Sequence, residues 1–385
     1  MRNYDVTIIG AGLAGLQCAR LLRAKGVTVL LADRKADLSN GIHTTGIFVR
    51  KTFEDFAFPA GTLGKPISRV SLYSPNLRRS GLESSLDEFR IGRMDVLYKS
   101  LLNDCVGSGV DFLAATRFIS VETYDGGSIV TLESEGTPVR IDTKVLVGAD
   151  GANSSVAKAI GLDQNRELIV GFEEVYERAK QHNDPRLHCF LDAELAPGYL
   201  AWIADDGHEI HVGVGGYAAH FKPRAALKTF KNKTRNIVDC RGLTFVESRG
   251  GQIPVGGVLK KIANRAGLLI GDAAGAVSPL TAGGLDPCMR LSTYAADIIA
   301  ESVRTRDPSI LLQYSGNEFR ARFVSRLWMR RAISLLKSQT FLELGCALLR
   351  GRLGNRFARH VFFGRGSFPD KRALGTYRAN ERPTL

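Results

Sequence analysis

The sequence predicts an α/β protein with two domains and a helical C-terminal segment. A strand–helix–strand unit is expected within residues 4–32, where two short apolar runs flank a stretch with helical spacing of its apolar residues. Two further apolar strands, at residues 143–149 and 267–270, each lead into an acid beside a glycine. Residues 165–260 alternate strand-like runs with turns, which predicts a second domain that is mostly β.

The composition is that of an ordinary globular protein. The chain has 385 residues, 44% of them hydrophobic and 24% charged, which suffices for one large or two medium domains. Its six cysteines include no CxxC pair, so we expect a reducing compartment and neither a zinc nor an iron–sulfur site. No signal peptide precedes the first strand, and no apolar run reaches the ~18 residues of a membrane span. We therefore expect a cytoplasmic protein.

The first unit contains a glycine turn with the spacing Gly-x-Gly-x-x-Gly. The turn follows a strand at residues 4–9 and opens a helix at residues 13–25, which Gly26 closes. In this pattern the first glycine permits the tight turn, the second lets a pyrophosphate approach the backbone, and the third lets helix and strand pack closely. These residues are Gly10, Gly12 and Gly15, with Ala14 beside the third. The helix N-terminus adds free N–H groups and a partial positive charge for the phosphates.

An acid ends the second strand of this unit. Asp33 follows the apolar run at residues 27–32, and Arg34 comes next. A carboxylate here accepts hydrogen bonds from ribose hydroxyls and repels a 2′-phosphate. We therefore predict that the site binds FAD or NAD rather than NADP, with Asp33 and Arg34 among the residues that contact it.

Two later segments favour FAD over NAD. The strand at residues 143–149 ends in Asp150, and the next one ends in Gly271 and Asp272. An acid at such a strand end can bind the ribityl chain of a flavin. The backbone of Gly283-Gly284 can approach an isoalloxazine ring, and the N-terminus of the helix that follows can stabilise negative charge on the reduced ring. A plain NAD dehydrogenase does not need these segments.

These elements, in this order, resemble the glutathione-reductase-type flavoproteins with the p-hydroxybenzoate hydroxylase fold. The run GDAAGAVSPLTAGG, which begins at Gly271, is most similar to the geranylgeranyl reductase branch. The resemblance implies a Rossmann-type FAD-binding domain of the glutathione-reductase type, an inserted, mostly β substrate domain and a basic helical C-terminal region. We expect the FAD-binding domain at residues 1–75, 90–160 and 262–305, the substrate domain at 76–89 and 161–261, and the C-terminal region at 306–385.

The resemblance also implies roles for single side chains. Arg93 matches an arginine that contacts FAD at the start of a helix, and a surface ion pair is the alternative. His43 lies in the loop that faces the flavin in this fold, where it can donate a proton to a substrate carbon after hydride transfer. The alternative is a histidine that is exposed to solvent or caps a turn. Cys288 is expected to pack rather than to take part in redox chemistry.

The strand-rich stretch contains an aromatic pair and a glycine run. Tyr199 and Trp202 precede a turn, and we interpret them as an aromatic wall over the flavin that contacts the substrate, with ordinary sheet packing as the alternative. The glycine run at residues 213–216 is not a second nucleotide site, because neither the helix nor the acid of that pattern follows it.

Positive charge gathers at the C-terminal end. Residues 320–385 hold 15 Lys or Arg and 3 Asp or Glu, while the formal net charge of the whole chain is +13. Helices with apolar and arginine faces are predicted here, and they suit the surface of an anionic membrane. Packing of the apolar face on the FAD-binding domain is the alternative, and nucleic-acid binding is the least favoured interpretation. The protein could then lie on the inner face of a membrane; its oligomeric state stays open.

The favoured function is that of an FAD-dependent oxidoreductase. Electrons would pass from FAD to a hydrophobic substrate, isoprenoid or lipid-like, and reduce its carbon–carbon double bonds, with NAD(P)H as a candidate transient reductant. We expect no metal site. Two alternatives stay open: a flavin-dependent monooxygenase of the aromatic hydroxylase type, and a non-enzymatic, membrane-associated flavoprotein.

Overall fold

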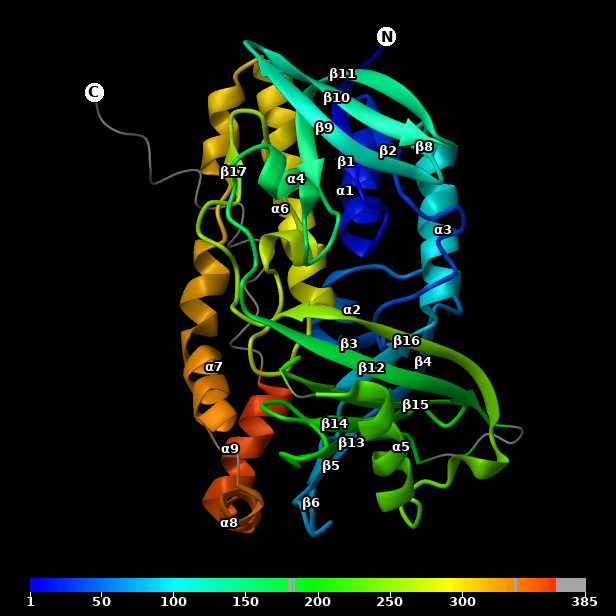
Figure 1. Ribbon diagram of the computed structural model, residues 1–385, viewed down its shortest axis with the longest axis vertical. Helices are drawn as coiled ribbons and strands as arrows, with labels where there is room; N and C mark the ends of the chain where they lie inside the picture. The colour runs from blue at the N-terminus through cyan, green and yellow to red at the C-terminus, as the bar shows by residue number, and fades with distance from the viewer. Residues whose placement is uncertain (179–181, 183, 220, 336–337, 365–385) are drawn as a thin grey trace.

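Two large sheets stacked along the long axis form the body of the protein (Figure 1). The computed structural model describes residues 1–178, 182, 184–219, 221–335 and 338–364. The upper sheet draws most of its strands from the first 150 residues, and the C-terminal helices run along one side (Figure 1). The predicted combination of a Rossmann-type layer, a β-rich second layer and a helical C-terminal segment is confirmed.

The upper sheet has eight strands and is parallel at its centre. β1 pairs in parallel with β2 and β11, and β11 pairs in parallel with β18, so the carboxyl ends of these strands lie at one edge. The main order is β17-β18-β11-β1-β2-β8, and β10 pairs with both β11 and β9. The bounds are Arg2–Ile9 (β1), Val29–Ala32 (β2), Asp111–Leu113 (β8), Thr116–Tyr124 (β9), Gly127–Ser134 (β10), Thr137–Gly148 (β11), Ala263–Asn264 (β17) and Gly267–Leu269 (β18).

Three long helices share a core with this sheet. α1 packs against both α3 and α6, and buried residues of all three belong to one cluster. Gly26 closes α1 with a φ of +78°, and its N–H donates to the carbonyl oxygen of Arg23 at 3.0 Å. The bounds are Leu13–Ala24 (α1), Met94–Gly107 (α3) and Leu285–Thr305 (α6), with the short helices Arg50–Asp55 (α2), Ser155–Ala159 (α4) and Gly271–Ala274 (η2).

The lower sheet has seven strands in the order β16-β12-β15-β14-β13-β5-β6. Neighbours are antiparallel except for β13 and β5. Helix α5 packs on one face through the fully buried Phe230. The bounds are Arg69–Tyr73 (β5), Arg79–Glu83 (β6), Leu168–Glu177 (β12), Arg186–Phe190 (β13), Ala201–Asp205 (β14), Glu209–Gly216 (β15), Thr244–Pro254 (β16), Pro223–Lys233 (α5) and Cys240–Gly242 (η1).

The pairing of β5 corrects one expected domain boundary. Residues 1–75 were expected in the FAD-binding domain, but β5 is a strand of the lower sheet. It pairs in parallel with β13, and the fully buried Val70 lies opposite Leu187. The chain therefore enters the lower sheet before residue 75, because this strand completes its core.

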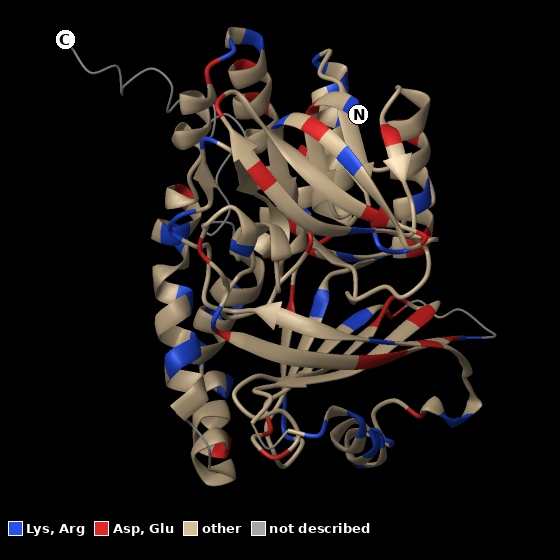
Figure 2. Ribbon diagram, turned by 45° about the horizontal axis from the view of Figure 1, so that its top comes forward, with Lys and Arg blue, Asp and Glu red and all other residues tan. Residues whose placement is uncertain are grey.

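A small sheet and the C-terminal helices join the two layers. The small sheet has the order β3-β7-β4. Ala358 of α9 is buried in a cluster with residues of the lower sheet, and Phe362 and Phe363 pack against that cluster. Figure 2 shows Lys and Arg recurring along the C-terminal helices. The bounds are Ile47–Val49 (β3), Leu63–Ile67 (β4), Phe89–Gly92 (β7), Pro308–Gln313 (η3), Asn317–Leu335 (α7), Gln339–Arg350 (α8) and Arg352–Phe363 (α9). The predicted basic residues after 364 lie outside the described residues.

Candidate functional site

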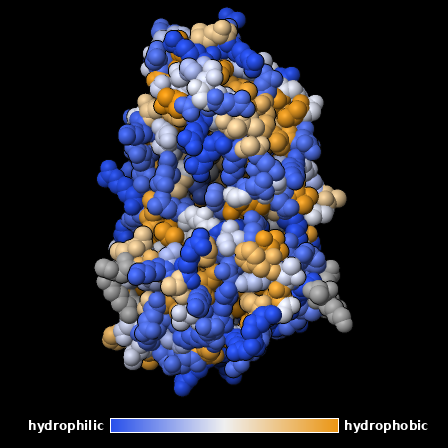
Figure 3. Space-filling model, turned by 45° about the vertical axis from the view of Figure 1, so that its right-hand side comes forward, coloured by the Kyte–Doolittle hydropathy of each residue, from blue (hydrophilic) through white to orange (hydrophobic). Residues whose placement is uncertain are grey.

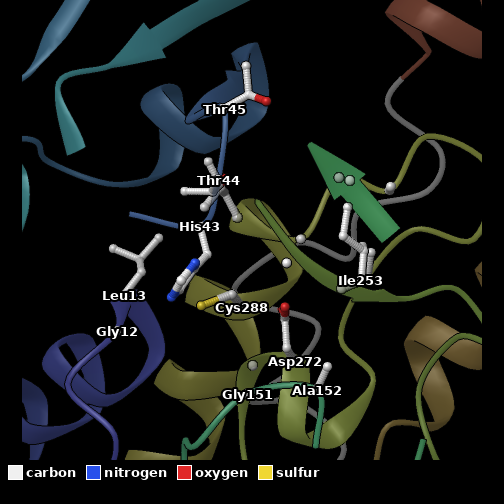
Figure 4. Close-up of a pocket in the computed structure, with 18 of the residues that line it drawn as sticks. Gly12, Leu13, His43, Thr44, Thr45, Gly151, Ala152, Ile253, Asp272 and Cys288 are labelled. Carbon is white, nitrogen blue, oxygen red and sulfur yellow. The ribbon is translucent and has the colours of Figure 1, made fainter. Parts of the chain in front are cut away.

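A cavity of about 1030 Å³ lies where the two large sheets meet. One side is lined by the glycine turn after β1, the segment after β11 and the segment that leads into α6. The other side is lined by residues of β12, β14 and β16. In Figure 4, Gly12, Asp272 and Ile253 surround the cavity from these different elements. The volume matches the largest of the usual ligand pockets, roughly 300–1,000 Å³, so a dinucleotide can be accommodated.

The glycine turn provides backbone for a ligand instead of side chains. Gly10 has a φ of +104°, and a Cβ there would lie 2.3 Å from the carbonyl oxygen of Ala149. A Cβ on Gly15 would lie 1.9 Å from the carbonyl oxygen of Gly10, so this glycine lets α1 pack against β1. A Cβ on Gly12 would meet nothing within 4 Å. Gly12 also precedes α1 without a side-chain cap, which leaves free N–H groups at an open position.

Asp33 lies beside this turn in a fixed orientation. Its Oδ2 accepts a hydrogen bond from the N–H of Ala11 at 2.6 Å, and its Oδ1 accepts one from the N–H of Lys35 at 2.8 Å. Asp33 and Arg34 both line the cavity. Each carboxylate oxygen can accept a second hydrogen bond, so Asp33 remains able to bind a hydroxyl group.

Asp150 offers a shielded acceptor on the same side. Its Oδ2 accepts hydrogen bonds from the N–H groups of Ser155 and Val156 at 2.7 and 3.2 Å. Its Oδ1 is shielded from solvent and accepts no hydrogen bond from the described residues. Burial raises the pKa of this carboxyl group. An unused buried acceptor of this kind points to a hydrogen-bond donor on a ligand.

Asp272 has the most strongly shifted carboxyl group of the cavity. It belongs to η2, and its side chain points into the cavity (Figure 4). Burial raises its pKa to about 6. A Cβ on Gly284 would lie 3.3 Å from Asp272 Oδ1, so the backbone before α6 comes close to this carboxylate. Gly283 and Gly284 line the cavity, and α6 begins there without a side-chain cap.

These features fit the parts of FAD. The open backbone at Gly12 suits a pyrophosphate, and the acceptors of Asp33 and Asp272 suit hydroxyl groups of ribose and ribityl. The N-terminus of α6 provides positive potential where a reduced ring carries negative charge. Ala14 and Gly271 complete the cavity-lining set, and Gly15 acts behind it through packing.

The structure corrects the role predicted for Arg93. Its guanidinium contacts Asp206 Oδ2 at 2.6 Å and Glu209 Oε2 at 2.8 Å, and Arg93 is not among the residues that line the cavity. Asp206 is fully buried, so its charge needs a buried cationic partner. The alternative, an ion pair, therefore describes Arg93, although the pair is largely buried rather than on the surface.

His43 and Cys288 both line the cavity but are poor proton donors. His43 Nδ1 lies 2.9 Å from the carbonyl oxygen of Gly250, so Nδ1 carries the proton and Nε2 is left as an acceptor. Burial and the nearby Lys35 lower the pKa of His43, which favours the neutral ring. Burial raises the pKa of Cys288, which therefore stays a thiol at neutral pH.

Tyr199 and Trp202 form an aromatic wall, and their rings pack directly against two glycines of β15. A Cβ on Gly213 would lie 2.2 Å from Trp202 Cζ2, and one on Gly215 would lie 2.6 Å from Tyr199 Cδ1. The Tyr199 hydroxyl donates to the carbonyl oxygen of Thr281 at 2.7 Å. Both aromatic residues line the cavity. The glycine run at residues 213–216 thus makes room for these rings and belongs to a strand, β15.

Sequence reasoning missed Glu173 and Arg249, which are 3% and 7% exposed and line the cavity. Glu173 lies at an inward position of β12, in phase with the buried Ile169 and Val175. A charged residue at a position of the strand where apolar residues are buried was the signal that could have identified Glu173. Phe362 and Phe363 also line the cavity from α9, and no local motif marks them.

The part of the chain that the structure describes contains neither a metal-binding cluster nor a membrane-spanning helix. No group of three or more His, Cys, Asp or Glu side chains there could hold a metal ion. None of the described helices is both long and apolar enough to cross a membrane.

Known proteins resemble the chain in sequence and in fold. The sequence model of the FAD binding domain matches residues 83–330, and that of the NAD(P)-binding Rossmann-like domain matches residues 8–60. Digeranylgeranylglycerophospholipid reductase 3 of Methanosphaera stadtmanae is 25% identical over 323 residues, which cover 80% of each chain.

Two solved structures share the fold at low sequence identity. A geranylgeranyl bacteriochlorophyll reductase-like protein from Thermoplasma acidophilum superimposes with a TM-score of 0.82 at 17% identity, covering 95% of this chain and 98% of that one. A p-nitrophenol 4-monooxygenase from Pseudomonas putida gives a TM-score of 0.67 at 13% identity, with coverage of 98% and 97%. This fold is therefore shared by proteins that are named for different reactions.

Proposed function

Because the chain belongs to the FAD-binding domain family, we propose that this FAD-dependent oxidoreductase reduces carbon–carbon double bonds of an isoprenoid or lipid-like substrate. One observation carries the proposal: a single cavity joins the nucleotide side to an apolar side walled by Leu187, Trp202, Phe362 and Phe363. Such a cavity suits a cofactor at one end and a hydrophobic chain at the other. The names of the reductase relatives support the same substrate class.

The residues of the chain would position the reactants. Bound FAD would supply the hydride, and the protein would supply position and polarity. In this assignment Gly12 and the N-terminus of α1 hold the pyrophosphate, and Asp33 and Asp272 accept hydrogen bonds from hydroxyl groups. Tyr199 and Trp202 exclude water from the reacting carbons. NAD(P)H is the candidate source of electrons.

A flavin-dependent monooxygenase is the second candidate. This chain shares its fold with a monooxygenase, the p-nitrophenol 4-monooxygenase. The apolar side of the cavity extends to Phe362 and Phe363 of α9, however. This composition favours a chain-like hydrocarbon over a phenol.

Anaerobic half-reactions separate the two candidates. The purified flavoprotein is reduced with NADH or NADPH, and then mixed either with a polyprenyl compound or with O₂ and an aromatic compound. We expect the polyprenyl compound to re-oxidise the flavin without O₂ and to gain two hydrogen atoms for each double bond reduced. An oxygenated aromatic product, with no re-oxidation by polyprenyl compounds, would favour the monooxygenase.

We also propose that α8 and α9 rest on an anionic membrane surface, which makes the protein a peripheral one. Leu348 is 70% exposed and Leu353 is 84% exposed, and Arg350 and Arg352 lie between them in the sequence. Apolar and cationic side chains together suit the interfacial region of a bilayer. The face in Figure 3 differs, because apolar residues there are scattered among hydrophilic ones. α9 also carries Phe362 to the cavity, so the same helix links this surface to the substrate side.

Vesicle binding tests this placement. We expect co-sedimentation with vesicles that contain phosphatidylglycerol, and at least about tenfold weaker binding to pure phosphatidylcholine. The double variant Leu348→Glu, Leu353→Glu should lose most of the binding. Leu312→Glu is the matched control, because Leu312 is a leucine 54% exposed on η3, outside these helices. Equal binding by all variants would contradict the placement.

A further inference from the structure

Saturating a double bond requires a proton as well as a hydride, and the cavity contains few groups that can supply one. His43 is held as a neutral ring with its Nδ1 proton directed to the Gly250 carbonyl. Cys288 is a buried thiol with a raised pKa. Glu173 also lines the described part of the cavity wall opposite the nucleotide side. Burial would raise the pKa of its carboxyl group, but hydrogen bonds from His211 and Thr45 lower it. Glu173 is therefore a carboxylate at neutral pH, and it can pass on a proton that another group holds.

Glu173 lies where three parts of the site converge. Its Oε2 accepts hydrogen bonds from Thr45 Oγ1 at 2.6 Å and from Trp202 Nε1 at 3.1 Å. Thr45 belongs to the loop on the flavin side, and Trp202 belongs to the aromatic wall. The carboxyl group is therefore held between the expected positions of the ring and of the substrate.

Behind Glu173, the fully buried His211 lies between two carboxylates. Its Nδ1 is 3.4 Å from Glu173 Oε1, and its Nε2 is 3.3 Å from Glu209 Oε2. Ionised carboxylates only accept hydrogen bonds, so both ring nitrogens must carry protons for both contacts to form. Burial would lower the pKa of His211, but the hydrogen bonds to Glu173 and Glu209 raise it above its ordinary value.

The far end of this row reaches towards solvent. The Glu209 side chain is 19% exposed, while the Glu173 side chain is 4% exposed. Two arginines face the row. Arg249 on β16 lies 3.9 Å from Glu173 and also pairs with Glu247. Arg93, which precedes α3, lies 2.8 Å from Glu209 and also pairs with Asp206. The positive charges of the two arginines offset the negative charges of the carboxylates, and neither arginine forms an ion pair with His211.

We propose that His211 holds the proton for the reaction and that Glu173 is the catalytic residue that passes this proton to the substrate, while Glu209 fixes the other side of the His211 ring. The inference rests on the proposed reductase function. A hydride from the reduced cofactor would form a new C–H bond at one carbon as the π bond breaks, and the His211 Nδ1 proton that Glu173 passes on would form the other. The cofactor is oxidised, and NAD(P)H reduces it again. His211 then keeps its proton on Nε2, which faces Glu209. Its Nδ1 regains a proton by the same route, from water that reaches Glu173 when the product leaves the cavity.

The position of the row distinguishes it from a purely structural ion cluster. Buried ion pairs cost desolvation energy, and a core can be built without them. This row has one member in the cavity wall and one at partial exposure, with an imidazolium between them. Shifted titratable groups in such an arrangement are typical of functional sites.

Separate half-reactions of the holoenzyme test the path. In Glu173→Gln we expect flavin reduction at the wild-type rate, but re-oxidation by a polyprenyl compound at least about 100-fold slower. Glu173→Asp keeps a carboxyl group and should recover at least about tenfold of this loss. The matched control is Glu174→Gln, because Glu174 bonds to Lys231 and Tyr176, outside the cavity lining. It should stay within about twofold of wild type.

The charge of His211 gives a readout independent of turnover. NMR of isotope-labelled histidine, with the signal assigned by its loss in His211→Asn, should show a titration above the ordinary value near about pH 6.5. Glu173→Gln should shift this titration to lower pH. A neutral His211 at about pH 6.5 would overturn the path, as would an active wild type whose Glu173→Gln variant re-oxidises equally fast. If the wild type reduces no polyprenyl compound, the proposed function fails, and the inference that rests on it fails too.

Discussion

The upper and lower sheets build their sides of the cavity by different means. The upper layer relies on backbone, with open glycine positions such as Gly12 and the uncapped N-termini of α1 and α6, and adds the carboxylates of Asp33 and Asp272. The lower sheet uses side chains, such as Glu173 and Trp202, that join through hydrogen bonds across strands. A nucleotide offers phosphates that backbone N–H groups bind and hydroxyls that carboxylates bind, whereas a hydrocarbon is recognised by the shape of the side chains around it. Substitutions in the upper layer should therefore impair flavin binding, and substitutions in the lower sheet should impair substrate binding.

The largest effect is expected from Gly15→Ala in the upper layer. The new Cβ would lie 1.9 Å from the Gly10 carbonyl oxygen, so α1 must move away from β1. We expect loss of flavin and a fall of about 3 kcal/mol in the free energy of unfolding, measured by chemical denaturation.

Gly12→Ala is the matched control for that prediction. Its Cβ would meet no protein atom within 4 Å. The free energy of unfolding of the flavin-free protein should change by no more than about 1 kcal/mol, while flavin affinity falls at least about tenfold. Similar stability losses in both variants would refute the distinction between packing and phosphate approach.

Asp272→Ala should give largely colourless protein, because the ribityl hydroxyls lose their acceptor.

The flavin-free protein offers a sharper test. The folded pKa of Asp272, about 6, exceeds its value of 3.8 in a model compound. Stability is therefore lost as pH rises from the lower value to the higher one. At about pH 7.5, Asp272→Asn should be more stable than wild type by up to about 2 kcal/mol, a difference that vanishes near about pH 4. Normal flavin content in Asp272→Ala would contradict the assignment.

Gly213→Ala should damage the lower side alone. A Cβ there would lie 2.2 Å from Trp202 Cζ2, so the indole must rise from β15 into the cavity. We expect unchanged flavin content and a KM for polyprenyl compounds raised about tenfold, which is about 1.4 kcal/mol. Steady-state kinetics and flavin absorbance on the same preparation measure both. A loss of flavin instead would show that the two sides are not independent.

The smallest effect concerns the stability that His211 contributes. Its folded pKa is raised, because the two hydrogen bonds to carboxylates outweigh burial. The contribution is therefore complete below the unfolded value near about pH 6.5 and is lost as pH rises through the folded pKa. Urea unfolding should show wild type losing about 1 kcal/mol at alkaline pH relative to His211→Asn. Parallel pH profiles would contradict the prediction.

The same contrast explains what could be predicted from the sequence. The glycine turn, Asp33 and the segments at Asp150 and Asp272 were predictable, because each pairs a strand end with a local spacing. Glu173 and Thr45 are 128 residues apart, and only strand register brings them together. Arg93 was misassigned because a match at one position does not reveal that Asp206 competes for its guanidinium.

The order of the strands has a consequence for how the protein is made. β5 and β6 leave the ribosome long before β13, the strand that pairs with β5, has been translated. The segment with Asp272 and the start of α6 emerges later still. The full set of backbone positions that we assign to the flavin therefore exists only after the start of α6 has been translated.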